Sequence, residues 1–150
     1  MSRALIIWPH QLFEQHPGLD QSPDRIVLFE DPLFFGDPSY PMRFHKQKLW
    51  LHRASMAHYG ARLSDAGYSV SLHAYKRDKA ALVNLLSVLK NDGIESVIAV
   101  DPVDFIAIKR LRKAAKDCGL VLELLASPGW LNTREQNENW SQGRKRWFMA

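Results

Sequence analysis

A short stretch rich in basic side chains is the part of this sequence best suited to binding an anion. Residues 37–48 begin as a proline-broken loop, continue into a predicted helix, and carry Arg43, His45, Lys46 and Lys48. Backbone N–H groups are unpaired at the start of a helix, so together with these side chains they would attract a phosphate or a nucleic acid. The same pattern is typical of a solvated basic helix start, and both interpretations stay open.

Polar residues also follow apolar runs that are typical of strands. They are His10 and Gln11, followed by the apolar Leu12, after the first run, Glu30 and Asp31 after the second, and Asp101 after a later one. In an open parallel sheet, ligands bind outside the carboxyl ends of the strands, which is where these residues are predicted to lie. The three carboxylates form a cluster there, or they only cap the turns and helices that follow.

Aromatic residues occupy the loop predicted at 33–41, which includes Phe34, Phe35 and Tyr40. Aromatic side chains in a long loop often form a lid or a contact surface. Their faces can stack on a flat ring, which would make Phe35 and Tyr40 candidates for contact with a ligand. Packing into the core is an equal alternative.

Several familiar motifs are missing from the sequence. The first strand is followed by Pro-His-Gln-Leu, and neither GxGxxG nor GxxxxGK[ST] occurs, which weakens a dinucleotide or ATP interpretation. No GxSxG nucleophile motif occurs either. His10 and His16 are six residues apart, as are His52 and His58, and this spacing is poor for joint ligation. We therefore predict no metal site.

The elements that must position these residues alternate between strand and helix. Strands are predicted at 4–8, 25–30, 68–75, 96–100 and 120–126, and helices at 44–66, at 79–91 and from Asp104 to Gly119. Such alternation predicts an α/β fold with one five-stranded parallel sheet and helices on both faces. We expect the strand order 3-2-1-4-5, with the third strand toward an edge.

Length and composition limit the class of protein. A chain of 150 residues fits one domain with a real core, and its net charge of +4 permits binding to nucleic acid without requiring it. Cys118 is the single cysteine, which excludes an internal disulfide and favours a reducing cytoplasm. No apolar run has the length of a spanning helix, so no membrane association is expected.

The C-terminal segment differs from the rest. Thr133 is predicted to cap a helix, with Gln136 as the partner in a capping box. Trp147, Phe148 and Met149 precede the last residue, Ala150, without a helix stop, and we expect these side chains to form an apolar contact surface. We therefore predict an α/β domain over 1–126, followed by a linker over 127–150 that begins a further part of a longer protein.

Four stretches, in order, give the sequence a family resemblance. They are Ile6 to Leu12, Leu28 to Glu30, Tyr40 to Leu63, and Ser127 to Met149 with Trp130, Trp140 and the run Gly143-Arg144-Lys145-Arg146. In this order and spacing, the chain resembles the N-terminal domain of the deoxyribodipyrimidine photolyase-related proteins. This family includes the bacterial cryptochromes and (6-4) photolyases that carry an iron–sulfur cluster. Where many members have Gly-Asp before Gln-Leu, this chain has Pro9-His10.

The resemblance implies a Rossmann-like antenna domain that binds 6,7-dimethyl-8-ribityllumazine and passes light energy to a flavin. It also implies that FAD and a [4Fe-4S] cluster belong to a C-terminal half that these residues do not include. If a pigment is bound, we expect Glu30 and His10 to hydrogen-bond its polar ring edge, and Tyr40 or Phe35 to cover its face. The change to His10 would alter which ring edge is read, or would fill the pocket.

The sequence therefore predicts the antenna-binding domain of a flavoprotein, either a light-dependent DNA repair lyase or a cryptochrome-like photoreceptor. We do not expect the 150 residues to be catalytic by themselves. The implied partners are the C-terminal catalytic domain and, through the full-length protein, DNA, with Arg43, Lys46 and Lys48 contributing electrostatic attraction. A standalone nucleotide-binding or regulatory α/β module is the alternative, as is an interaction domain with a vestigial pocket.

Overall fold

Five short strands form one parallel sheet in the order β3-β2-β1-β4-β5. The computed structural model describes residues 1–144. The strands are β1 (Arg3–Ile7), β2 (Arg25–Phe29), β3 (Val70–His73), β4 (Ser96–Val100) and β5 (Val121–Leu125). This is the predicted Rossmann-like arrangement, in which the chain builds outward from β1 in one direction and then in the other. The order reverses between β1 and β4, which therefore flank the switch point of the sheet.

The apolar runs explain which strands are central. β1, β2 and β4 are almost entirely buried, because helices or loops cover both of their faces. β1 pairs in parallel with β2, with Leu5 opposite Ile26, and with β4, with Leu5 opposite Ile98. β3 is only partly buried and lies at an edge, as its alternating sequence predicted.

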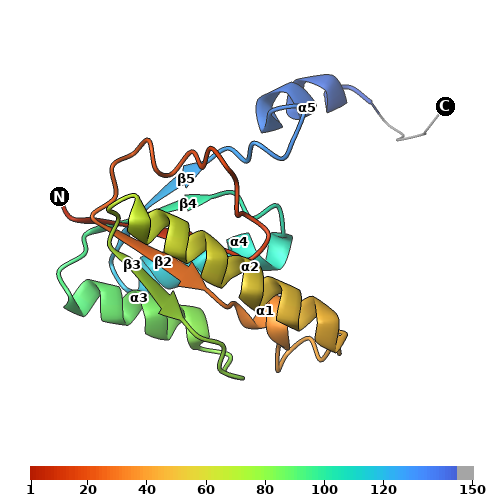
Figure 1. Ribbon diagram of the computed structural model, residues 1–150. Coiled ribbons are helices and arrows are strands. Elements are labelled where there is room, and N and C mark those ends of the chain that lie inside the picture. The colour runs from red at the N-terminus through yellow and green to blue at the C-terminus, as the bar shows by residue number, and fades with distance from the viewer. Residues whose placement is uncertain (145–150) are drawn as a thin grey trace.

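The helices cover both faces of the sheet, as predicted. α3 (Ala81–Asn91) and α4 (Phe105–Asp117) pack on the face that carries Trp8 and Phe29. α2 (Lys46–Asp65) covers the other face with Met56, Tyr59 and Leu63, and Figure 1 shows it crossing in front of the strands. Gly60 permits this close packing, since a Cβ atom there would lie 2.8 Å from Leu28 Cδ1.

Helix boundaries differ from the prediction in three places. The segment assigned to the loop 33–41 begins with a short helix, α1 (Pro32–Phe35), whose N-terminus Asp31 caps. Four residues are too few to show a helical period, although an Asp-Pro start is the expected signal for a helix N-terminus. α2 begins at Lys46 rather than at 44, with His45 as its N-cap, and α3 begins at Ala81 rather than at 79.

The segment after β5 carries one further helix, α5 (Arg134–Ser141). The predicted capping box between Thr133 and Gln136 is present. α5 has no buried residue and stands apart from the sheet in Figure 1. The apolar surface predicted at residues 147–149 lies outside the described residues. Within residues 1–144, no helix combines the length and the apolar character needed to cross a membrane.

Candidate functional site

The turn after β1 is joined to the turn after β4 across the switch point. Gln11 Nε2 donates hydrogen bonds to the carbonyl oxygens of Val100 and Asp101, at 3.0 and 3.2 Å. His10 Nε2 lies 2.9 Å from the carbonyl oxygen of Pro102. The turn folds back on itself because the Gln11 N–H donates to the carbonyl oxygen of Trp8. The β1 and β4 ends are therefore held together by amide and imidazole groups instead of a glycine-rich loop.

Gln11 also presents an unused polar atom at this point. The side chain is only 1% exposed, and its Oε1 is buried without a hydrogen-bond partner. A buried acceptor of this kind costs about 1–3 kcal/mol unless something donates to it. A ligand N–H group at the switch point would remove that cost.

Asp31 connects the β2 end to the same region. Its Oδ2 accepts a hydrogen bond of 2.8 Å from Trp8 Nε1, and its Oδ1 accepts the backbone N–H of Leu33 at 3.0 Å. Burial raises the pKa of Asp31, although both hydrogen bonds and the charge of Arg110 act in the opposite direction. Both carboxylate oxygens are occupied, so Asp31 acts here as a helix cap and as a partner of the Trp8 indole.

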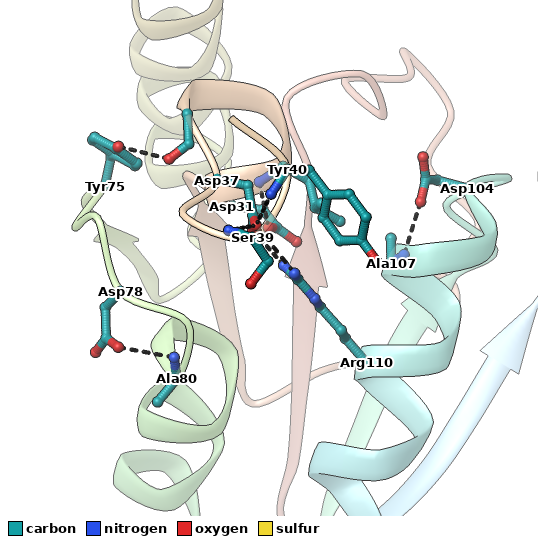
Figure 2. A network of polar contacts seen from close by, with 12 residues as sticks. Asp31, Asp37, Ser39, Tyr40, Tyr75, Asp78, Ala80, Asp104, Ala107 and Arg110 are labelled. Carbon is teal, nitrogen blue, oxygen red and sulfur yellow. Dashed lines mark hydrogen bonds and ion pairs between the residues drawn. The ribbon is translucent and has the colours of Figure 1, made fainter. Parts of the chain in front are cut away.

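A second carboxylate, Asp37, ties the loop after α1 to α4. It is 3% exposed and forms a bidentate ion pair with Arg110, with Nη2 3.2 Å from Oδ1. The same Oδ1 accepts the backbone N–H groups of Ser39 and Tyr40, and the Arg110 guanidinium lies 5.5 Å from the Tyr40 ring centre. Figure 2 shows the Arg110 guanidinium and the loop residues Ser39 and Tyr40 gathered around the Asp37 carboxylate.

Burial alone would raise the pKa of Asp37, but hydrogen bonds from Arg110 and from the Ser39 and Tyr40 N–H groups together lower it. The ion pair also raises the pKa of Arg110. Sequence reasoning did not single out either residue. The available signal was an arginine on a half-buried position of α4, between Ile108 and Leu111, where a counter-charge is required.

Aromatic rings cluster beside the switch point. His10 stacks on Phe34 with ring centres 4.6 Å apart, and Phe35 lies 5.9 Å from Tyr75 and 5.8 Å from His52. His52 Nε2 is buried without a hydrogen-bond partner, which makes it the second unused polar atom near this edge. Burial lowers the pKa of His52, and the positive charges of Lys48 and His10 lower it further, so the ring is neutral at pH 7.

Glu30 lies on the other side of the edge, toward α2 and β3. Arg53 Nε donates to its Oε1 at 3.1 Å, and the backbone N–H of Tyr75 donates to its Oε2 at 2.8 Å. Its side chain is only 4% exposed, so Arg53 compensates a buried charge. Both oxygens of Glu30 are thus already engaged by the protein.

The predicted site residues divide into several groups. His10, Gln11 and Asp101 meet at the switch point, whereas Glu30 faces α2 and Leu12 packs into the core beneath that helix. Asp101 lines a cleft of about 550 Å³ between the start of α4 and residues 126–141. Glu30 lines a separate cleft of about 470 Å³ between α2 and β3.

The remaining positions are the basic residues at the start of α2, the other contacts of Asp101 and the possible metal ligands. Arg43, Lys46 and Lys48 are exposed at the start of α2. Asp101 accepts the N–H of Val103 at 2.8 Å and lies 3.8 Å from Arg134. Across residues 1–144, no three His, Cys, Asp or Glu side chains gather closely enough to hold a metal ion.

The fold and this edge define a doubly wound α/β domain with polar and aromatic side chains gathered at its switch point. The chain belongs to the deoxyribodipyrimidine photolyase-related protein family, whose model matches residues 5–150. It is also similar to an uncharacterized protein of Acanthamoeba polyphaga mimivirus, with 31% identity over 136 residues. That match covers 89% of this chain and 68% of the viral protein.

Proposed function

We propose that the chain is the antenna-pigment domain of a light-dependent DNA photolyase or a cryptochrome-like photoreceptor. Membership of the photolyase-related family supports the general class. The observation that carries the pigment site is the buried, unpartnered Oε1 of Gln11 at the switch point. Domains of this fold bind ligands at that point, and a buried acceptor there needs a donor.

The pigment 6,7-dimethyl-8-ribityllumazine fits the residues present. Its pyrimidine-dione edge offers one N–H donor between two carbonyl acceptors. Gln11 Oε1 would accept from the N–H group, and His52 Nε2, in the tautomer that carries its proton there, would donate to a carbonyl oxygen. Phe34, which stacks on His10, and Phe35, which lies beside His52, would supply the aromatic surface. When bound, the pigment would supply absorption of blue and near-ultraviolet light.

This placement refines the roles predicted for Glu30 and His10. Glu30 is held by Arg53 and Tyr75, and His10 by the Pro102 carbonyl, so each would contribute by positioning the side chains around the pigment. Tyr40 packs against Arg110 and would act on the pigment only through the ion pair of Arg110 with Asp37, which we call the Asp37 clamp. The polar edge of the ring is then read by an amide and a neutral imidazole.

The test is a titration of the 150-residue chain with 6,7-dimethyl-8-ribityllumazine, followed by fluorescence anisotropy. We expect saturable binding that weakens about three- to tenfold in His52→Phe, which keeps a ring but removes the Nε2 group. The control is His58→Phe on the exposed side of the same helix. Gln11→Leu should weaken binding at least as much, with its folding checked by circular dichroism. A folded wild-type chain that does not bind the pigment at saturating concentration would exclude the antenna function.

A further inference from the structure

Positive charge is concentrated in one part of the chain. Residues 38–91 contain nine Lys or Arg and two Asp or Glu, a net charge of +7, whereas the whole chain has +4. The remaining residues therefore carry a net negative charge. Segregation of this kind produces a directed field and marks a surface for a polyanion more specifically than a high isoelectric point does.

Two segments of this region bring their charges to the same edge of the sheet. Residues 43–48 enter α2 from the carboxyl end of β2, and residues 76–79 follow the carboxyl end of β3. β2 and β3 are parallel neighbours, so these two ends lie at one edge. Glu30 joins them directly, because its two oxygens accept from Arg53 of α2 and from the Tyr75 N–H.

Contacts around α1 connect residues that lie next to these two segments. The Tyr75 hydroxyl donates to the Gly36 carbonyl oxygen at 2.8 Å, as Figure 2 shows, and Phe35 touches both Tyr75 and His52. We call the resulting surface the basic corner, and its members are Arg43, Lys46, Lys48, Lys76, Arg77 and Lys79.

The charges of the basic corner are exposed and have no anionic partner. All six side chains are exposed, and none belongs to an ion pair among residues 1–144. The carboxylate inside the second segment, Asp78, accepts instead from the Ala80 N–H and from Asn84 Nδ2. Some cations elsewhere are paired with carboxylates, such as Arg25 with Asp92 and Arg110 with Asp37. Six unpaired cations repel one another, and an external anion would relieve that repulsion.

An aromatic side chain stands beside these charges. Trp50 lies one helical turn after Lys46, on the same side of α2, and is 71% exposed. Met42, just before the helix, is 65% exposed. Exposed aromatics next to cations form the stacking platforms of proteins that bind single-stranded nucleic acid, because every base offers a flat face.

We propose that the basic corner binds single-stranded nucleic acid, with its cations along the phosphodiester backbone and Trp50 stacking on a base. The proposal does not require a bound pigment, although Phe35 and His52 contribute to both sites. It extends the attraction predicted for Arg43, Lys46 and Lys48 to the loop after β3. The chemistry is that of the phosphodiester backbone and of an unpaired base, which both DNA and RNA supply.

The experiment measures affinity for fluorescein-labelled oligothymidylate of about 12 nucleotides by anisotropy across a salt series. The variants are Lys76→Gln/Arg77→Gln/Lys79→Gln and Trp50→Ala. We expect the triple variant to lose at least tenfold in affinity at low salt and to reduce the salt slope by about 2. Trp50→Ala should lose about tenfold with an unchanged slope.

The matched control removes the same charge from α4, as Lys109→Gln/Arg112→Gln/Lys116→Gln, at three exposed positions. We expect this control to bind within about twofold of the wild type. An equal loss in the control would mean that net charge alone attracts the oligonucleotide, which would overturn the proposal. Tighter binding to a duplex of the same length, or no effect of Trp50→Ala, would overturn the single-strand assignment. Oligouridylate in a parallel titration distinguishes RNA from DNA as the source.

Discussion

Two regions at the same edge of the sheet handle charge in opposite ways. At the loop after α1, Asp37 is buried and Arg110 half-buried, and each compensates the other. At the basic corner, six cations are exposed with no ion-pair partner in the described structure. Charges with a protein partner hold the loops in place, whereas charges without one are available to something outside the protein.

The largest loss of stability is expected when one member of the buried ion pair is removed. Arg110→Met leaves the Asp37 carboxylate buried without its cation, and we expect about 3 kcal/mol of lost stability in urea unfolding. Lys113→Met is the matched control, because its pair with Asp117 lies on the exposed surface of the same helix. That change should cost under 1 kcal/mol. Equal effects of the two variants would mean that the Asp37 clamp does not stabilise the fold.

The burial of a neutral histidine, His16, should lower the free energy of unfolding by a comparable amount, but only at low pH. His16 is 2% exposed, its Nδ1 accepts the Gly18 N–H, and burial lowers its pKa to about 4. The unfolded chain takes up this proton near pH 6.5, so the stabilisation is complete above that pH and is lost as the pH falls toward 4. The loss amounts to roughly 3 kcal/mol at most.

The measurement is urea unfolding at several pH values for the wild type and for His16→Asn. The variant should show a flatter decline between pH 6.5 and 4, whereas His58→Asn, which alters an exposed position, should parallel the wild type. Parallel curves for the wild type and His16→Asn would show that His16 is not buried in its neutral form.

The contact between Trp8 and Asp31 gives an intermediate effect. Trp8→Phe removes the indole N–H that donates to Asp31 Oδ2 and leaves that buried oxygen without this partner. A hydrogen bond to a charged group contributes about 1.5–3 kcal/mol, so we expect about 2 kcal/mol of lost stability. The pKa of Asp31, already raised by burial, should rise further. Carboxyl chemical shifts during a pH titration would check this, and an unchanged pKa would count against the bond.

The smallest expected change in stability comes from a substitution in the basic corner, at Lys46. α2 has no acidic residue in its first turn, although the helix dipole favours negative charge there. Lys46→Glu should therefore raise stability by about 0.5 kcal/mol in urea unfolding while weakening binding to oligothymidylate. Lys46→Gln should lie between the wild type and Lys46→Glu in both stability and affinity. A loss of stability in Lys46→Glu would show that Lys46 has a structural role in the protein.

The sequence by itself determined the architecture. Five apolar runs separated by helical periods predicted the strand order 3-2-1-4-5, and local cap signals at Asp104 and Thr133 were confirmed. The periods and caps depend on neighbours a few residues apart, which the sequence displays directly. The rules that govern connections between parallel strands then limit the strand order. The family was identified in the same way, from the order of four stretches, and its model matches residues 5–150.

Only the tertiary structure decided which polar groups are occupied. Gln11 meets Val100 across 89 residues and Arg110 meets Asp37 across 73, and no local spacing encodes either contact. The sequence placed Glu30 and Gln11 together at one edge, and we expected Glu30 rather than Gln11 to hydrogen-bond the pigment ring. The fold gives both oxygens of Glu30 to Arg53 and Tyr75 and leaves Gln11 Oε1 without a partner. A buried polar group is satisfied only when a partner lies within hydrogen-bond distance, and that depends on the tertiary structure. The residue types showed which groups could bind a ligand, and the fold determined which of them has no protein partner.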